Sequence, residues 1–356
     1  PAYKLGSDME YRKLGHSDID VSVICLGTMT YGEQNTEQEA HQQLDYALDQ
    51  GVNFIDTAEM YAVPIKPETQ GLTEQYIGSW IAGRSNRDKF VLASKVAGPG
   101  VDHVRGGTQL NRKQITEALE GSLSRLQTDY LDLYQVHWPS RNSNFFSVLD
   151  YVADASEDLA AQEESIHETL ATLSDLHQQG KIRTIGLSNE SAWGTMRYLQ
   201  LAKQHGLERI VTVQNPYSLL NRSYEIGMAE VSHRESIGLL AYSPLGFGVL
   251  TGKYQKDGGP KEARLNRWKE YFPRYVTSAG IDATERYIAL AEANGLTPTQ
   301  LALAFVNTRS FVASNIIGAT TMDQLKENIE TWDITLSDEV MTGVQEIHQQ
   351  ISNPCP

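Results

Sequence analysis

The chain has 356 residues, of which 40% are hydrophobic and 21% charged, a mixture typical of a globular protein with a large core. Its 30 Lys and Arg against 45 Asp and Glu give a formal net charge of −15, and an acidic surface disfavours nucleic acid and anionic membranes as partners. Two cysteines, Cys25 and Cys355, exclude a disulfide framework and suit a reducing compartment, although a single bridge between them stays open. Without a recognisable membrane helix or secretory signal, we expect a cytoplasmic protein.

The chain divides into two parts near its N-terminus. We interpret residues 1–8 as an artificial leader ahead of a native start at Met9, and residues 9–356 as a single domain. Residues 10–22, with a turn at positions 15–18, predict a β-hairpin.

Eight short apolar runs follow, mostly without polar alternation, which is typical of parallel strands covered on both faces. They lie at 23–26, 53–55, 90–93, 131–136, 184–187, 210–213, 238–241 and 315–317. Helical spacing is found over 37–50, 112–125, 166–179, 193–205, 282–294 and 322–330, and Thr297 with Pro298 opens a further helix. This alternation predicts an α/β fold, a (β/α)8 TIM barrel closed at the bottom by the hairpin. A doubly wound sheet is the alternative, but no Gly-x-Gly-x-x-Gly spacing occurs.

Two long segments interrupt the alternation, 139–165 after the fourth strand and 246–280 after the seventh. Both follow strand carboxyl ends, so both should overhang the active-site face of a barrel. Their length favours lids or substrate loops, although long loops can also be merely tolerated.

Ionisable side chains end three successive strands: Asp56 and Tyr61 after the second, Lys95 on the third and His137 on the fourth. Each alone has an ordinary explanation, as a cap, a core-edge tyrosine, a solvated lysine or a buried histidine. A barrel brings the four to one mouth. There, Lys95 should lower the phenol pKa of Tyr61 from about 10, Asp56 should hold Lys95, and His137 should bind the Tyr61 hydroxyl or a substrate carbonyl. Such a site exchanges a proton with a carbonyl or alcohol oxygen and needs a hydride partner.

These residues, together with motifs at 186–189, 214–217, 242–246 and 318–321, resemble the aldo-keto reductases over roughly residues 9–350. The pattern is similar to the bacterial Tas-type branch of that family, and it also resembles the β subunits of voltage-gated potassium channels. The resemblance implies NADP(H) at the barrel mouth, a small carbonyl substrate, and Asp56, Tyr61, Lys95 and His137 as the catalytic residues, with Tyr61 as proton donor. No protein partner is required, and the oligomeric state stays open. A cofactor-binding regulatory or redox-sensing subunit with slow turnover is the alternative function.

The resemblance also implies a cofactor path along the barrel mouth. Ser188, Asn189 and Gln214 should hold the nicotinamide carboxamide, Tyr242 should stack on the ring, and Thr28, Met29 and Asp56 should border it. The remaining positions should follow the pyrophosphate and the adenosine: Ser243, Leu245, Gly246, Gly248 and Lys253, then Gly318, Thr320, Gln324, Glu327 and Asn328.

One departure from the commonest family pattern concerns the cofactor's 2′-phosphate. Ala319, Thr320 and Gln324 stand where many relatives carry a Lys-Ser pair and an arginine. The 246–280 segment offers a basic cluster instead, which favours NADPH with Arg264 as the leading phosphate partner, although a solvated basic loop is the alternative. The cluster is Lys253, Lys256, Lys261, Arg264, Arg267 and Arg274.

Two further expectations concern the substrate and metals. The residues predicted to supply an apolar substrate wall are Met29, Tyr31, Trp138, Phe145, Phe146 and Tyr151, although Phe145 and Phe146 could equally pack the insertion onto the barrel. The nine histidines and two cysteines show no metal-ligand spacing, so no metal site is expected.

Overall fold

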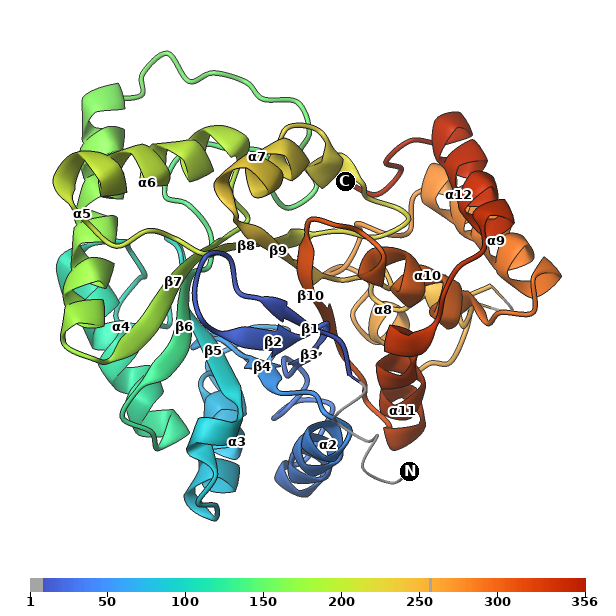
Figure 1. The fold of residues 1–356 in the computed structure, drawn as a ribbon, viewed down its shortest axis with the longest axis horizontal. Coiled ribbons are helices and arrows are strands. Elements are labelled where there is room, and N and C mark those ends of the chain that lie inside the picture. The colour runs from blue at the N-terminus through green and yellow to red at the C-terminus, as the bar shows by residue number, and fades with distance from the viewer. Residues whose placement is uncertain (1–8, 256–257) are drawn as a thin grey trace.

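A computed structural model describes residues 9–255 and 258–356, so the predicted leader and Lys256 lie outside the described residues. The predicted hairpin is present: β1 (Tyr11–Lys13) and β2 (Asp20–Ser22) pair antiparallel. It lies across the centre of the barrel in the view of Figure 1.

Within the described residues, eight parallel strands close into a barrel, with β10 pairing to β3 and each strand otherwise pairing to its neighbour in sequence. The eight predicted strands and the (β/α)8 fold are therefore confirmed. The strands are β3 (Ile24–Gly27), β4 (Phe54–Asp56), β5 (Val91–Val96), β6 (Leu131–Val136), β7 (Ile182–Ser188), β8 (Thr212–Pro216), β9 (Gly238–Tyr242) and β10 (Val312–Ile317).

Helices surround the barrel (Figure 1). They are α2 (Glu37–Asp49), α3 (Leu72–Ala82), α4 (Arg112–Leu126), α5 (Leu159–Gln178), α6 (Ala192–His205), α7 (Met228–Glu235), α8 (Arg264–Arg267), α9 (Ser278–Ala293), α10 (Pro298–Asn307), α11 (Met322–Glu330) and α12 (Asp338–Gln350). Short 3-10 turns are η1 (Arg87–Lys89), η2 (Ser223–Glu225), η3 (Val249–Thr251) and η4 (Thr331–Asp333). Of these helices, α3, α7, α8 and α12 are not among those that the sequence pattern predicts.

The start of α5 differs from the prediction. The helix begins at Leu159 behind an Asp158 cap whose side chain accepts from the Ala161 amide, so the long loop is 139–158 rather than 139–165. Residues 159–165 bury no side chain, and the first buried residue of the helix is Ile166. Hydrophobic periodicity is absent from an exposed helical turn, and for that reason the pattern placed the start too late.

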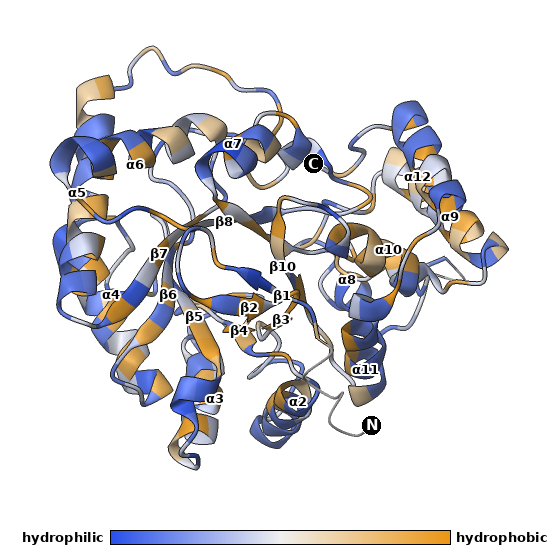
Figure 2. Cartoon of the chain, in the orientation of Figure 1, coloured by the Kyte–Doolittle hydropathy of each residue, from blue (hydrophilic) through white to orange (hydrophobic). Residues whose placement is uncertain are grey.

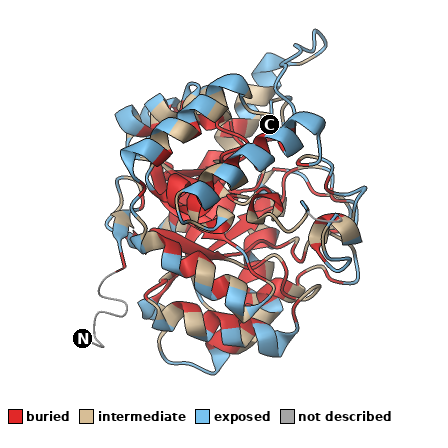
Figure 3. Ribbon diagram, turned by 90° about the vertical axis from the view of Figure 1, so that its right-hand side faces the viewer, coloured by how far each residue is buried: buried red, intermediate tan, exposed pale blue. Residues whose placement is uncertain are grey.

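Burial explains why these segments form strands and helices. The residues of β5 and β6 are buried throughout, as parallel strands covered on both faces require. Figure 2 shows hydrophobic residues concentrated in the strands, and Figure 3 shows the buried interior enclosed by exposed helical surfaces. Helix α2 illustrates the covering layer: a capping box of Thr36 and Glu39 starts it, and Ala40, Leu44 and Ala47 face inward.

The hairpin closes the end of the barrel at which the parallel strands begin. Leu14, Ile19 and Val21 join a buried cluster that includes Phe54 and Leu133 from the strands. The turn needs glycine because Gly15 has a φ of +59° and an added Cβ would lie 2.4 Å from the Val211 carbonyl oxygen. Because the hairpin covers this end, a ligand can enter the barrel only at the opposite end, where the strands have their carboxyl ends.

Two long connections lie at the carboxyl ends of the strands. Residues 137–158 join β6 to α5, and residues 243–277 join β9 to α9 and include η3 and α8. None of the helices in the described part of the chain has the length and apolar character that crossing a bilayer requires.

Candidate active site

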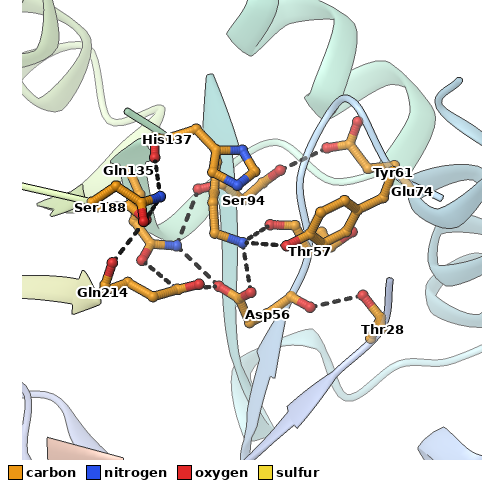
Figure 4. A network of polar contacts seen from close by, with 12 residues as sticks. Thr28, Asp56, Thr57, Tyr61, Glu74, Ser94, Gln135, His137, Ser188 and Gln214 are labelled. Carbon is orange, nitrogen blue, oxygen red and sulfur yellow. Dashed lines mark hydrogen bonds and ion pairs between the residues drawn. The ribbon is translucent and has the colours of Figure 1, made fainter. Parts of the chain in front are cut away.

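The ends of β4, β5 and β6 bring the four predicted ionisable residues together (Figure 4). The Lys95 ammonium donates to Asp56 Oδ2 at 2.6 Å, to the Thr57 carbonyl at 2.9 Å and to the Tyr61 oxygen at 3.2 Å. The His137 ring meets the Tyr61 ring edge-on, with centroids 5.9 Å apart. Lys95 is fully buried and Asp56 nearly so. The result is a buried ion pair with a tyrosine hydroxyl at its outer end.

Burial controls the charge states of Tyr61 and Lys95. It raises the pKa of Tyr61 above the ordinary value of 10, and the Lys95 charge offsets this only in part. The expected lowering of this pKa is therefore wrong, because desolvation of the phenolate outweighs the ammonium beside it. For Lys95, burial disfavours the ammonium, but Asp56 and Tyr61 outweigh it and raise the lysine pKa. The resting site holds a neutral phenol next to a charged lysine.

His137 is a neutral imidazole. Burial, and secondarily the Lys95 charge, lower its pKa well below 6.5. Within the described structure its buried Nδ1 has no hydrogen-bond partner. Because His137 also lines the cavity described next, it can offer a hydrogen bond to a bound oxygen without adding a positive charge.

A cavity of about 910 Å³ opens beside the four residues and extends to α11. Asp56, Tyr61 and His137 line it, while Lys95 lies behind them. The predicted cofactor residues that also line the cavity are Thr28, Met29, Ser188, Asn189, Gln214, Tyr242, Ser243, Leu245, Gly248, Lys253, Arg264, Gly318, Thr320, Gln324, Glu327 and Asn328. This volume suits a large ligand.

Gly246 is the one predicted cofactor residue outside the cavity lining. Its φ is +57°, and an added Cβ would lie 2.9 Å from Val249 and 3.1 Å from Tyr275. The structure thus corrects the predicted contact. Gly246 allows a turn in the connection, and it faces Val249 and Tyr275 of the same connection rather than the cavity.

Polar side chains at the ends of β7, β8 and β9 form one hydrogen-bonded group. Tyr242 donates to Asn189 Oδ1 at 2.6 Å, and the Asn189 amide donates to the His137 carbonyl at 2.9 Å. Ser188 donates to the Gln214 carbonyl at 2.9 Å. These contacts hold the aromatic ring and the amides at fixed positions next to the acid–base residues.

Two cations project into the cavity from the 243–277 connection. Neither Lys253 nor Arg264 forms an ion pair with any described residue, although both line the wall. Burial lowers the pKa of Arg264 to about 10, and burial together with the nearby Arg264 charge lowers the pKa of Lys253. Two partly desolvated positive charges without counter-ions are suited to an anion such as a phosphate.

The other basic residues of that connection are engaged elsewhere or exposed. Arg267 lies 3.7 Å from the Glu33 carboxylate, and Arg274 donates to the Pro356 carbonyl at 2.8 Å. Lys261 is exposed. Folding thus separates Arg264 and Lys253 from a cluster whose members look equivalent in sequence.

The far end of the cavity is polar and is built around α11. Gln324 Oε1 accepts from the Thr320 amide at 2.9 Å, and Asn328 donates to the Gly318 carbonyl at 3.1 Å. Glu327 accepts from Thr297 at 2.7 Å. Such hydrogen-bonding groups suit the ribose and base of a nucleotide. With the amides, the unpaired cations and this polar end in one cavity, the residues present fit a nicotinamide dinucleotide.

Two of the predicted substrate residues, Tyr31 and Trp138, lie outside the cavity wall. Tyr31 is fully buried, and its hydroxyl donates to Gln43 at 3.0 Å. Trp138 donates to the Pro99 carbonyl at 3.1 Å and packs behind His137. The structure corrects both predictions, because core packing and a satisfied hydrogen bond turn these rings away. Of the other residues predicted for this wall, Met29 and Phe146 line the cavity, whereas Phe145 and Tyr151 do not.

Sequence reasoning assigned no role to Gln135, a fully buried residue of β6 that bonds to Asp56 and Gln214. The available signal was a carboxamide inside a mostly apolar strand, two residues before His137. Among the described residues no group of acidic, histidine or cysteine side chains is arranged to hold a metal ion.

The fold and site define a class of barrel protein that carries a buried Asp–Lys pair and a tyrosine at its strand ends. The chain belongs to the aldo/keto reductase family, whose profile matches residues 23–349. It is 53% identical over 351 residues to Protein tas of Escherichia coli (strain K12), covering 98% of this chain and 100% of that protein.

More distant relatives agree with this placement. The chain is 33% identical to the uncharacterized oxidoreductase YrpG of Bacillus subtilis (strain 168), covering 95% of this chain and 96% of that protein. It is 28% identical to norsolorinic acid reductase B of Dothistroma septosporum, covering 95% and 81%. The protein is therefore an oxidoreductase, and members of its family generally use a nicotinamide cofactor.

Proposed function

We propose that the protein reduces aldehydes and ketones to alcohols with NADPH, and that Tyr61 is the proton donor. The observation that carries the proposal is the Lys95 ammonium, which contacts both Asp56 at 2.6 Å and the Tyr61 oxygen at 3.2 Å beside a large cavity. Bound NADPH supplies a hydride to the carbonyl carbon. Every other requirement of the reaction falls to residues of the chain.

Tyr61 transfers its phenolic proton to the substrate oxygen as negative charge develops there. Its raised pKa keeps the proton in place until that moment. The phenolate that remains lies next to Lys95, whose charge Asp56 maintains. Lys95 therefore acts after the proton leaves, by stabilising the product charge, more than by acidifying the resting phenol.

His137 orients the carbonyl. A neutral imidazole can donate a hydrogen bond to the substrate oxygen without competing with Tyr61 as the acid. The short distance between the His137 and Tyr61 rings lets one oxygen contact both side chains. Met29 and Phe146 give the adjoining wall an apolar surface for the remainder of the substrate.

The preference for NADPH over NADH rests on Lys253 and Arg264. Their lack of carboxylate partners among the described residues leaves two positive charges for the extra phosphate. The polar groups of α11 and the 318–321 segment would then hold the nearby ribose and adenine.

The test is initial-rate oxidation of NADPH with 4-nitrobenzaldehyde by the wild type and by Tyr61→Phe. Loss of a general acid lowers the rate by about 10²- to 10⁴-fold, whereas NADPH binding should change by less than about twofold because the phenol makes no cofactor contact in this proposal. A wild type that binds NADPH but reduces no member of a broad carbonyl panel would refute the reductase function. A mutant that keeps its rate would refute the role of Tyr61.

A further inference from the structure

Gln135 lies on β6 to one side of the acid–base residues, close to Ser188 and Gln214, and is fully buried (Figure 4). Its side-chain amide donates to Asp56 Oδ1 at 3.0 Å, and its Oε1 accepts from the Gln214 amide at 2.9 Å. A buried carboxamide is costly unless both of its ends are paired. Here both ends are paired, each with a residue of the candidate site.

The orientation of Gln214 follows from these contacts. Its two amide hydrogens point to Asp56 Oδ1 at 3.0 Å and to Gln135 Oε1 at 2.9 Å. Rotating the carboxamide by a half turn would place its oxygen against two acceptors, which is unfavourable. Gln214 therefore presents an acceptor oxygen to the cavity that it lines. An acceptor at that position selects an N–H donor, such as the amide of a nicotinamide carboxamide.

The orientation of Asp56 depends on the same residue. Lys95 occupies Oδ2, while Gln135 and Gln214 both donate to Oδ1. Three donors on a nearly inaccessible carboxylate fix its plane and keep Oδ2 directed at the lysine. Without Gln135, the carboxylate keeps its charge partner but loses one of the contacts that fix its plane.

We propose that Gln135 is a positioning residue that couples the acid–base centre to cofactor recognition. Through one carboxamide it orients Asp56 toward Lys95 and directs the acceptor of Gln214 toward the nicotinamide carboxamide. This inference rests on the proposed nicotinamide site. It is tested by measuring NADPH binding, so the result does not depend on which carbonyl compound the protein reduces.

The first test is Gln135→Met, which keeps the side chain's length and removes its hydrogen bonds. NADPH binding, measured by protein fluorescence quenching, should weaken by about 3- to 10-fold, the effect of losing a neutral hydrogen bond. The matched control is Asn307→Leu. Asn307 is also a buried carboxamide and accepts from Asn315 at 2.9 Å, but it lies in α10, outside the cavity lining. The control should bind NADPH as the wild type does.

The second test is Gln135→Glu, which distinguishes positioning from general packing. In its neutral form the introduced carboxyl can donate to Asp56 and accept from Gln214, so NADPH affinity should stay within about twofold of the wild type. In its ionised form it opposes the Asp56 anion and loses its donor. The ionisable group that contacts residue 135 is Asp56 from β4, and Asp56 is itself paired with Lys95 from β5.

The two variants lead to definite outcomes. Relative to the wild type, Gln135→Glu should lose NADPH affinity reversibly by at least about threefold as pH rises through the range where its carboxyl ionises. A Gln135→Met variant that binds like Asn307→Leu, or a Gln135→Glu variant whose affinity follows the wild type at every pH, would overturn the proposal. If Gln135→Met does not fold, the pH titration of Gln135→Glu decides alone. A wild type that binds NADPH but reduces no carbonyl compound would refute the proposed function. It would not affect the test of Gln135, which measures NADPH binding alone.

Discussion

Replacement of Arg264 by methionine tests the proposed cofactor preference most directly. Arg264 lines the cavity, has no ion-pair partner among the described residues, and packs its guanidinium over the Phe247 and Phe272 rings at 5.4 and 5.9 Å. Methionine removes the charge and keeps an apolar stem against those rings. The expected result is a loss of affinity for NADPH with affinity for NADH retained.

The size of the effect follows from the desolvation of the guanidinium. Burial lowers the pKa of Arg264 from 12.5 to about 10, which corresponds to about 3 kcal/mol of unfavourable charge burial. A phosphate next to this charge offsets that penalty, and hydrogen bonds to charged groups contribute about 1.5–3 kcal/mol. The Kd for NADPH should therefore rise about 10- to 150-fold. Lys253 remains in place, which favours the lower half of that range.

The assay is fluorescence titration of the wild type and the variant with NADPH and with NADH. The matched control is Arg267→Met, since Arg267 belongs to the same short helix but lies 3.7 Å from Glu33. The control should bind both cofactors like the wild type. Equal weakening of NADPH and NADH by Arg264→Met would refute the reasoning, because only NADPH carries the 2′-phosphate.

Three further predictions concern the acid–base centre and the substrate wall. Lys95→Met leaves the Asp56 carboxylate buried without its cation, so the free energy of unfolding in urea should fall by about 3–5 kcal/mol. Adding Asp56→Asn should restore part of this loss. A double variant as unstable as the sum of the two single changes would contradict the ion-pair account. Because burial lowers the pKa of His137 well below 6.5, kcat/KM should show no limb near pH 6.5, and a limb there that disappears in His137→Gln would show that the imidazole titrates. Phe146→Ala should raise KM for aromatic aldehydes about 2- to 12-fold relative to short aliphatic ones; an equal change for both classes would remove Phe146 from the substrate wall.

The fold and the location of the site could be predicted because their signals are local. Continuous apolar runs mark buried parallel strands, and capping residues such as Thr36 and Thr297 mark where helices begin. Once a barrel is predicted, every strand's carboxyl end must lie on one face. Asp56, Lys95 and His137 therefore had to meet whatever the details of packing.

Tertiary structure alone decided the properties that depend on desolvation and on distant partners. The pKa of Tyr61 is raised where the sequence suggested a lower value, since the degree of burial is set by the surrounding fold. Arg264 and Arg267 lie three residues apart in one helix, yet only Arg267 meets a carboxylate, supplied by Glu33 from the far end of the sequence. Gln135 acquires its partners from β4 and β8. Hydrophobic periodicity reports which face of an element is buried, but it does not report which polar groups that face will meet.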